Sequence, residues 1–164
     1  MEIRLLQKQE LSLTRDLAEK IWPFTYGDII SQKQLHFMLE WMYSNDALEK
    51  SFDKGNEFYG AFDNTKAIGF FELEFLNENP NTVKLQKIYV LPSEQKNGLG
   101  TKLLQFGIIH SKNKGANKII LQVNRDNKAV DFYLKNNFSI ISEEDFPIGN
   151  GYYMNDYVME KTLI

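Results

Sequence analysis

The segment from Ile88 to Leu104 constrains the fold most, because it joins an apolar run to a helical pattern through a short polar loop. The β-prone residues end at Pro92, and the loop closes with Gly98-Leu99-Gly100. A strand, a loop and a helix in this order turn the backbone N–H groups of the loop and the first helical turn outward, where they can bind an anion. Two nearby glycines let the backbone approach a bulky diphosphate without interference from a Cβ atom. The segment therefore predicts a site for a phosphate-bearing ligand.

The spacing of the glycines narrows the class of ligand. The dinucleotide fingerprint G-x-G-x-x-G needs a third glycine, which does not follow at the required place. The NTPase loop G-x-x-x-x-G-K-[ST] does not fit either. The pattern that does fit is Q-x-x-G-x-G, at Gln95, Gly98 and Gly100. This segment resembles the acetyl-CoA pyrophosphate loop of the GCN5-related N-acetyltransferase superfamily.

A second segment carries further residues of the same resemblance. Residues 118–123 read as a buried strand, and a helical segment at 127–137 follows. The superfamily typically shows a strand, then an Asn-started helix with Ala and a Phe/Leu-Tyr pair, then Gly-Phe; the matching residues here are Asn127, Ala129, Phe132, Tyr133 and Phe138. Asn137 replaces the usual glycine. Asparagine is the non-glycine residue that best tolerates the left-handed region, so the replacement is compatible with a helix end.

The resemblance covers essentially the whole chain and implies an α+β fold with α/β/α layers. Its central sheet is mixed and mostly antiparallel, with one splayed parallel strand pair, and residues 1–164 are expected to form a single acetyltransferase domain. A first helix is expected to stop at Pro23, and a second to start with Ser31 as its N-cap. The expected strands are 2–6, 57–62, 67–76, 82–90, 118–123, 138–145 and 152–162, and the expected helices are 9–21, one from Ser31, a short one at 47–52, 98–114 and 127–137.

Composition excludes several other classes of protein. The chain has no cysteine, which excludes disulfides, thiolate zinc sites and a cysteine nucleophile, and which fits a cytoplasmic location. No run of 18 apolar residues and no signal-peptide pattern occurs, so no membrane association is expected. A net charge of −3 provides no basic stripe, so nucleic acid is not an expected partner. His36 and His110 have no second ligand at metal-binding spacing, and no metal is expected.

By resemblance, acetyl-CoA is the co-substrate. In the superfamily the strand before the loop and the strand at 118–123 splay apart, and the pantetheine arm pairs with backbone groups between them, as an added strand would. The loop holds the pyrophosphate. The residues expected to contact the co-substrate are Ile88, Tyr89, Val90, Gln95, Lys96, Asn97, Gly98, Leu99, Gly100, Thr101, Asn124, Asn127 and Tyr133.

Transfer of an acetyl group to an amine poses two protonation problems. An amine with a pKa of about 10 is nucleophilic in only about one molecule in a thousand at neutral pH, and the departing thiolate gains from a proton. Tyr133 is the expected proton donor by resemblance, the alternative being that it only packs against the pantetheine. Glu72 and Glu74 share one face of a central strand and are candidates for the base. They could instead pair with Lys84 or Lys87 across the hairpin, or a water chain could take the proton.

The acceptor is expected to be a small primary amine, polyamine-like or amino-acid-like, which attacks directly in a ternary complex. Tyr26, in the connector that roofs the acceptor site by resemblance, and Tyr152 with Asp156, in the last hairpin, are the candidate substrate contacts. The final strands could equally serve an edge in a homodimer. Two other functions stay open: acetylation of protein N-termini or lysines, and a non-catalytic acyl-CoA-binding regulatory module.

Overall fold

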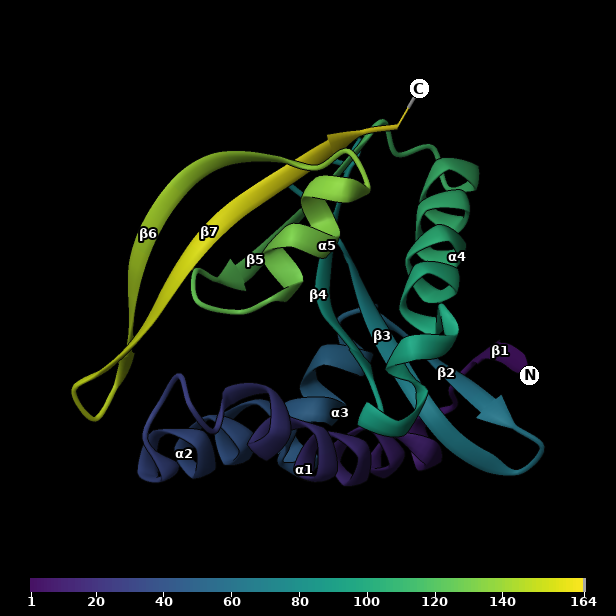
Figure 1. The fold of residues 1–164 in the computed structure, drawn as a ribbon. Helices are drawn as coiled ribbons and strands as arrows, with labels where there is room; N and C mark the ends of the chain where they lie inside the picture. The colour runs from purple at the N-terminus through teal and green to yellow at the C-terminus, as the bar shows by residue number, and fades with distance from the viewer. Residues whose placement is uncertain (164) are drawn as a thin grey trace.

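The sheet contains seven strands in the order β1-β2-β3-β4-β5-β7-β6. The computed structural model describes residues 1–163, and Figure 1 shows the strands with helices on both faces. Every neighbouring pair is antiparallel except β4 with β5, so the predicted mixed sheet with one parallel pair is confirmed. The strands are β1 (Glu2–Leu5), β2 (Glu57–Asp63), β3 (Lys66–Phe75), β4 (Thr82–Val90), β5 (Lys118–Asn124), β6 (Ser139–Gly149) and β7 (Tyr152–Thr162).

Two groups of helices cover the two faces of the sheet, and neighbouring residues of β3 show the division. The ring of Phe70 packs against Tyr43 of α2 (Gln32–Tyr43), whereas the ring of Phe71 packs against Phe106 of α4 (Leu99–Asn113). Successive side chains of a strand point to opposite faces, so both layers bury aromatic side chains. The helices are α1 (Ser12–Tyr26), α2 (Gln32–Tyr43), α3 (Asn45–Asp53), α4 (Leu99–Asn113) and α5 (Ala129–Lys135), with short 3₁₀ turns at η1 (Lys8–Glu10) and η2 (Pro92–Asn97).

The helix starts follow local side-chain chemistry, but one predicted helix end is wrong. The hydroxyl of Ser31 accepts a hydrogen bond from the Gln34 N–H at 3.1 Å, as predicted for an N-cap. The first helix does not stop at Pro23 but continues to Tyr26. A proline in the last turn removes one backbone donor, and packing of Tyr26 against Trp22, with ring centroids 4.8 Å apart, holds the extra residues on the core.

The only parallel strand pair in residues 1–163 is short, and the two strands then separate. The pairing of β4 with β5 runs from Thr82 to Leu85 of β4, although that strand continues to Val90. Where the pairing ends, β4 contains a bulge: Leu73 of β3 lies opposite Leu85 while the preceding residue lies opposite Lys87, so Gln86 is the extra residue. A bulge bends its strand and increases its twist. The bend opens a wedge between the ends of β4 and β5.

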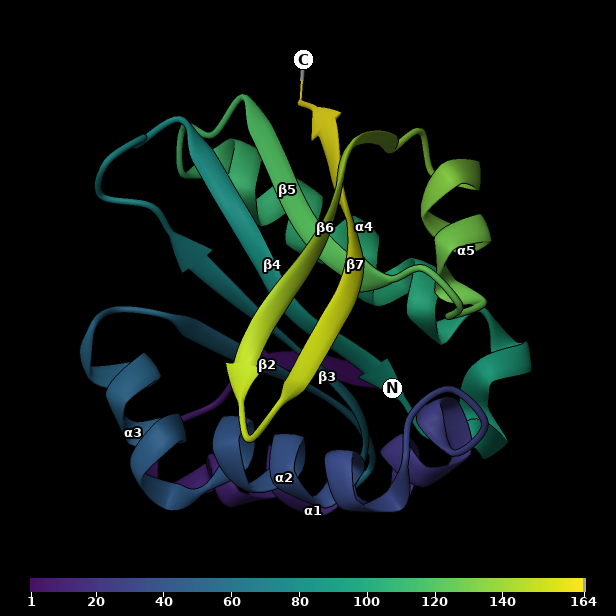
Figure 2. The ribbon, with the colours of Figure 1, turned by 90° about the vertical axis from the view of Figure 1, so that its left-hand side faces the viewer.

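The β6–β7 hairpin leaves the sheet and reaches α2. Figures 1 and 2 both show its tip beside that helix. The side chain of Gln34 donates a hydrogen bond to the Tyr153 carbonyl at 2.8 Å, and the ring of Phe37 packs against Tyr152 with centroids 5.3 Å apart. These contacts close one side of the space between the sheet and α2.

Asn137 ends α5 in the left-handed conformation, as predicted, with φ +68°. The Phe138 N–H bonds to the Tyr133 carbonyl at 3.0 Å, and the Asn137 N–H bonds to the Leu134 carbonyl at 3.1 Å. These two bonds form a Schellman motif, and the accompanying apolar contact joins the rings of Tyr133 and Phe138. The motif therefore fixes the end of the helix that carries Tyr133.

This conformation predicts the effect of two substitutions at one position. Asn137→Ala is expected to destabilise the protein by about 1 kcal/mol, because a Cβ without a compensating polar group disfavours positive φ. Asn137→Gly is expected to change stability by less than about 0.5 kcal/mol, since glycine adopts this region freely. Urea unfolding of both variants measures the difference. Equal losses for alanine and glycine would show that the amide side chain, and not the backbone conformation, is what matters.

Candidate active site

The predicted anion site lies where η2 meets α4. Gly98 has φ +73°, and α4 begins at the next residue, with the first helical bond running from the Lys102 N–H to the Gly98 carbonyl at 3.1 Å. The N–H groups between these two residues precede the helical ladder and are available to an anion. A Cβ atom at Gly98 would meet nothing within 4 Å, so glycine is required by the backbone conformation and not by crowding.

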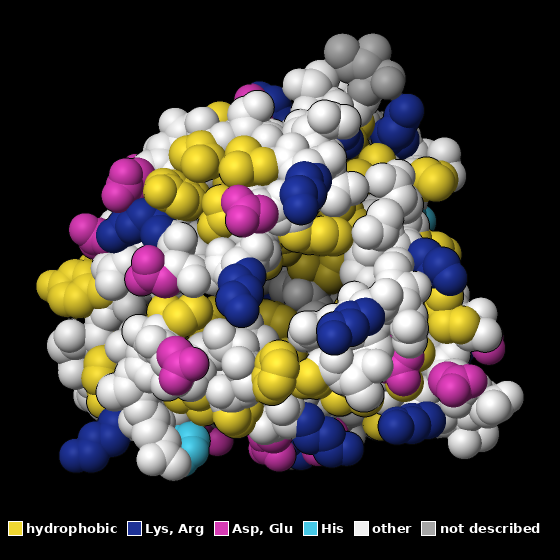
Figure 3. All heavy atoms as spheres, viewed as in Figure 1, with side chains coloured by type: hydrophobic (Ala, Val, Ile, Leu, Met, Phe, Trp, Pro, Cys, Tyr) yellow, Lys and Arg dark blue, Asp and Glu magenta, His cyan; other side chains and the backbone are white. Residues whose placement is uncertain are grey.

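A cavity of about 950 Å³ connects this loop to the wedge and to α1 and α2. Figure 3 shows the surface hollowed near the middle of the view, with hydrophobic atoms inside and Lys or Arg side chains around the opening. Most of the residues that the sequence predicted for the co-substrate and the acceptor line this one cavity: Tyr26, Ile88, Tyr89, Val90, Gln95, Gly98, Gly100, Thr101, Asn124, Asn127, Tyr133 and Asp156.

Four other predicted contact residues do not line the cavity. The Asn97 amide donates a hydrogen bond to Glu94 at 3.2 Å, and the side chain of Lys96 is exposed. The side chain of Leu99 belongs to the core, so only its backbone is available to a ligand. Tyr152 packs on α2 instead, and its neighbour Tyr153 lines the cavity.

Tyr133 lies in the cavity wall between two other rings. Its ring centroid is 5.4 Å from that of Phe132 and 5.5 Å from that of Phe138, and its residue surface is 6% exposed. Within residues 1–163, no side chain or backbone group hydrogen-bonds its hydroxyl. Burial raises the pKa of this phenol above its ordinary value of 10, so the hydroxyl keeps its proton at neutral pH. The site thus contains a protonated, unpartnered donor beside the wedge.

Three polar side chains join α1, β4 and the start of α5 across the cavity. The hydroxyls of Tyr26 and Tyr89 share a hydrogen bond at 2.7 Å, and the Asn127 amide donates to Tyr26 at 3.4 Å. The side-chain carbonyl oxygen of Asn127 accepts a bond from the Ala129 N–H at 2.9 Å, which fixes the turn that leads into α5. Burial raises the pKa of Tyr26, so this network is neutral at physiological pH.

Asp156 brings a buried carboxyl group to the part of the cavity that β7 lines. It lies on β7 opposite Asn124 of β5, its residue surface is 5% exposed, and it lines the cavity. Burial raises the pKa of this carboxyl from 3.8 to about 6, although the charges of Arg125 and Lys84 act in the opposite direction. Asp156 is therefore ionised at neutral pH and neutral in mild acid.

The raised pKa of Asp156 predicts a pH-dependent effect on stability. The folded state binds this proton more tightly than the unfolded state, so the favourable contribution is complete below pH 4 and is lost as the pH rises through 6. Asp156→Asn removes this dependence. Relative to wild type, the variant is expected to gain about 2 kcal/mol of stability between pH 4.5 and pH 7. Chemical denaturation at both pH values measures the gain, and a constant difference would contradict the assignment.

Glu72 and Glu74 are held by protein partners and do not line the cavity. The Glu72 residue is 1% exposed, and its carboxylate accepts hydrogen bonds from the Asn56 amide at 2.8 Å and from the Lys87 ammonium group. Glu74 accepts a hydrogen bond from Gln86 and forms an ion pair with Lys54 at 3.3 Å. The structure thus supports the ion-pair interpretation of Glu72, with Lys87 as the partner.

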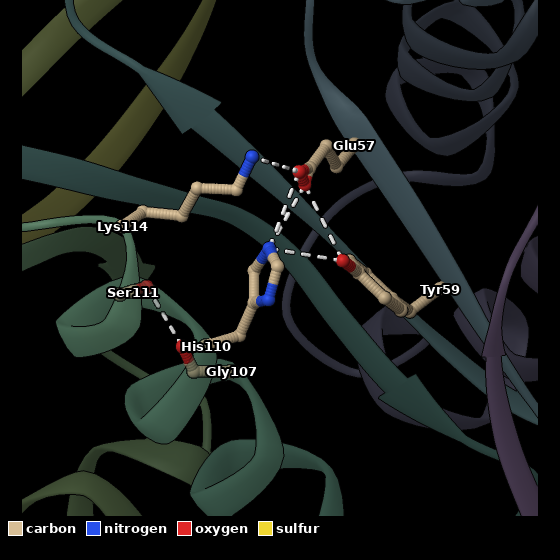
Figure 4. Close-up of polar contacts among 6 residues, drawn as sticks. All are labelled: Glu57, Tyr59, Gly107, His110, Ser111 and Lys114. Carbon is tan, nitrogen blue, oxygen red and sulfur yellow. Dashed lines mark hydrogen bonds and ion pairs between the residues drawn. The ribbon is translucent and has the colours of Figure 1, made fainter.

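His110 is not isolated, contrary to the impression from the sequence, but it lies outside the cavity. Figure 4 shows its Nε2 atom directed at Glu57 of β2, 3.0 Å from the nearer carboxylate oxygen, and 3.0 Å from the Tyr59 hydroxyl. Lys114 adds an ion pair to Glu57 at 3.7 Å. The cluster joins α4 to the sheet on the face opposite α1. Within residues 1–163, no group of three or more His, Cys, Asp or Glu side chains could hold a metal, and no helix is long and apolar enough to cross a membrane.

Two exposed aromatic residues complete the cavity on the α1 and α2 side. Phe24 and Trp41 line it, although 69% and 48% of their surfaces are exposed. The sequence contained one signal for Trp41, because it falls outside the apolar helical face that carries Leu35, Met38, Leu39 and Met42. Large apolar side chains off the core face of a helix often mark a binding surface.

Comparisons with known proteins agree with this geometry. A spermidine N(1)-acetyltransferase of Thermoplasma acidophilum is 28% identical over 98% of this chain and 96% of its own length. The structure of the PaiA N-acetyltransferase from the same organism, in complex with coenzyme A, is 29% identical with a TM-score of 0.81 and covers 98% of both chains. The ribosomal-protein-S18-alanine N-acetyltransferase from Escherichia coli shares the fold, with a TM-score of 0.76 at 16% identity over 99% of this chain and 93% of that one.

The family assignment follows from the segment that carries both motifs. The Acetyltransferase (GNAT) family matches residues 14–138, which include the glycine loop, the wedge and Tyr133. This match covers more than half of the 164 residues. The chain belongs to the GNAT acetyltransferase family and is an N-acetyltransferase.

Proposed function

We propose that this enzyme transfers the acetyl group of acetyl-CoA to a primary amine of a small molecule, by direct attack in a ternary complex. One observation carries the proposal: a single cavity runs from the glycine loop, through the wedge between β4 and β5, to the acceptor residues of α1 and β7. Such a path lets a thioester at the end of a long, phosphate-bearing arm meet an amine that enters from the other side.

The loop and the wedge provide the contacts that coenzyme A needs. The backbone N–H groups from Leu99 to Thr101 bind the pyrophosphate at the positive end of α4, and the segment from Gln95 to Gly98 leads into this site. Beyond Leu85, the edge of β4 that faces β5 has no strand partner within the described residues, so Ile88 and Val90 offer backbone groups to the amides of the pantetheine arm. The PaiA structure with coenzyme A, at 29% identity, supports this assignment.

Tyr133 serves the leaving group. Its hydroxyl is protonated at neutral pH and has no protein partner within residues 1–163, so it is free to donate a proton to the departing sulfur. An acyl-enzyme route would need a nucleophile, and the chain has no cysteine. Direct attack by the amine is therefore the simplest route through this site.

The closed acceptor side favours a small amine over a protein chain. The bond from Gln34 to Tyr153 and the packing of Phe37 on Tyr152 join the β6–β7 hairpin to α2. These contacts restrict the space beside the acceptor residues, which suits a small amine better than a folded protein chain. The 28% identical spermidine N(1)-acetyltransferase also supports a polyamine-like acceptor, and the carboxylate of Asp156 is suited to an ammonium group.

A thiol-release assay tests the proposal. Acetyl-CoA is supplied with spermidine, an aminoglycoside, free amino acids, a lysine-containing peptide and a peptide with a free N-terminus, and free coenzyme A is measured together with the mass of each product. We expect at least one small amine to be acetylated faster than either peptide. Faster acetylation of a peptide would reverse the acceptor class. Binding of acetyl-CoA without acetylation of any amine would identify a non-catalytic acyl-CoA-binding module instead.

A further inference from the structure

Asp156 differs from the other deeply buried carboxylate of this chain in its partners. Glu72 accepts hydrogen bonds from Asn56 and Lys87. Asp156 is 5% exposed, yet within residues 1–163 no group donates a hydrogen bond to its carboxylate. Buried carboxylates are normally hydrogen-bonded or paired. Asp156 lines the cavity, and its carboxylate oxygens are not among the fully buried, unpartnered side-chain atoms, so the carboxylate is open to a cation that enters there.

The cations nearest to Asp156 are held by other groups. Arg125, which follows β5, forms ion pairs with Asp145 at 2.7 Å and Glu143 at 3.3 Å, and it reaches only the backbone carbonyl of Asp156, at 3.4 Å. Lys84 of β4 contacts the Gln122 side chain at 3.5 Å. Both charges act on Asp156 at a distance without neutralising it.

The remaining neighbours of Asp156 are neutral or exposed. Tyr26 of α1 stays protonated, and its hydroxyl is shared with Tyr89 and Asn127. Glu144 is the register partner on β6 and is exposed. Asn124, opposite on β5, uses its carbonyl oxygen to accept the Asp126 N–H at 2.9 Å. None of these groups competes with an incoming amine for the carboxylate.

We propose that Asp156 is the general base of the reaction and binds the ammonium group of the acceptor before taking its proton. This inference rests on the proposed function and adds the identity of the base. It moves that role from Glu72 and Glu74, which have protein partners and lie outside the cavity, to a carboxylate on the opposite part of the sheet.

The reaction converts an ammonium group and a thioester into an amide and a thiol, with the release of one proton. The ammonium group first loses one proton to Asp156, which passes it to solvent. The free nitrogen lone pair then forms the C–N bond, and the electron pair of the C=O double bond moves to oxygen. As that pair returns, the C–S bond breaks and the sulfur takes a proton from Tyr133. The nitrogen loses its second proton to Asp156, and this proton replaces the one that Tyr133 gave. One proton is released to solvent for each amide formed.

Steady-state kinetics between pH 5 and pH 9 test the inference, with spermidine as the probe or, if spermidine is not acetylated, the best amine of the panel. For wild type, kcat/KM is expected to rise with an apparent pKa of about 6 and then level off. In Asp156→Asn, kcat at pH 7 should fall about 100-fold, and the rate should rise with pH throughout, because only amine that is already neutral can react. Asp156→Glu should keep the inflection in the pH profile of kcat/KM. In the control variant Glu144→Gln, on the neighbouring strand, kcat should stay within about twofold of the wild-type value.

The outcomes separate this inference from the proposed function. If wild type acetylates no amine, the proposed function fails before any variant is compared. If wild type is active and Asp156→Asn changes only KM, Asp156 is an anchor and not the base, and the inference is overturned. An unchanged kcat with an unchanged KM overturns it as well. Binding of acetyl-CoA by calorimetry reports whether the variant is folded, and Asp156→Ser is judged by the same criteria should the asparagine variant fail to fold.

Discussion

Tyr133→Phe is expected to lower kcat for an amine acceptor by about 10² to 10³-fold at neutral pH. The phenol is the protonated donor in the cavity wall, and phenylalanine keeps the ring between Phe132 and Phe138 while removing the proton that the sulfur needs. The dissociation constant of acetyl-CoA should change by less than about threefold, because most of the expected co-substrate contacts lie on other residues and the phenylalanine ring keeps the packing surface of Tyr133. Thiol release and isothermal calorimetry measure the two quantities.

The free energy of unfolding and a matched control variant show whether the Tyr133 hydroxyl has a chemical role or only a packing role. No described residue bonds the Tyr133 hydroxyl, so its removal should change the free energy of unfolding by less than about 0.5 kcal/mol. Tyr59→Phe makes the same chemical change in the His110 cluster, outside the cavity, and should leave kcat unaltered. An unaltered kcat in Tyr133→Phe as well would mean that the ring only packs against the co-substrate.

Structural features that depend only on residues close together in the chain were predictable from the sequence. Ser31 caps a helix because its hydroxyl reaches an N–H three residues later, and Asn137 ends one because its backbone tolerates positive φ. The glycine loop behaves in the same way, since Gly98 needs only its own left-handed conformation. Each of these features involves a few consecutive residues, so the sequence contains all of the relevant chemistry.

The pairing of Glu72 with Lys87 depends on a β-bulge that the local sequence pattern does not predict. Alternation places Glu72 and Glu74 on one face of β3, as predicted. Lys84 and Lys87 are three residues apart, so a regular β4 would place them on opposite faces. The extra residue Gln86 brings both to the face of the two carboxylates, opposite Glu74 and Glu72 respectively. The bulge therefore decides which carboxylate is buried with a partner, and it also opens the wedge.

The burial of Asp156 and the identity of its neighbours depend on the order of the strands in the sheet. Because β7 inserts between β5 and β6, Asp156 lies opposite Asn124, a residue 32 positions earlier in the chain. The hairpin also contacts α2 through Gln34, more than a hundred residues from Tyr153. The sequence analysis predicted Asp156 as a substrate contact from its residue type and its position in the last hairpin. Its burial and its lack of a protein donor follow from contacts among three distant segments, which a sequence pattern does not reveal.

Breaking the buried ion pair of Glu72 and Lys87 is expected to cause a large loss of stability. The side chains of this pair are 1% and 8% exposed, and the Lys87 ammonium also lies 5.1 Å from the centre of the Tyr43 ring. Lys87→Met keeps much of the side-chain volume but leaves the carboxylate without a countercharge. We expect a loss of about 3 to 5 kcal/mol in the free energy of unfolding and a fall of roughly 10 °C in Tm.

A double variant distinguishes an uncompensated charge from lost packing. Glu72→Gln combined with Lys87→Met removes both charges, while the glutamine carbonyl can still accept the Asn56 hydrogen bond. Replacing a whole buried pair with neutral groups is often close to neutral in stability. The double variant should therefore recover most of the loss measured for Lys87→Met alone. If both variants were equally destabilised, the contribution of Lys87 would come from its packing against Tyr43 and Phe58, and not from its charge.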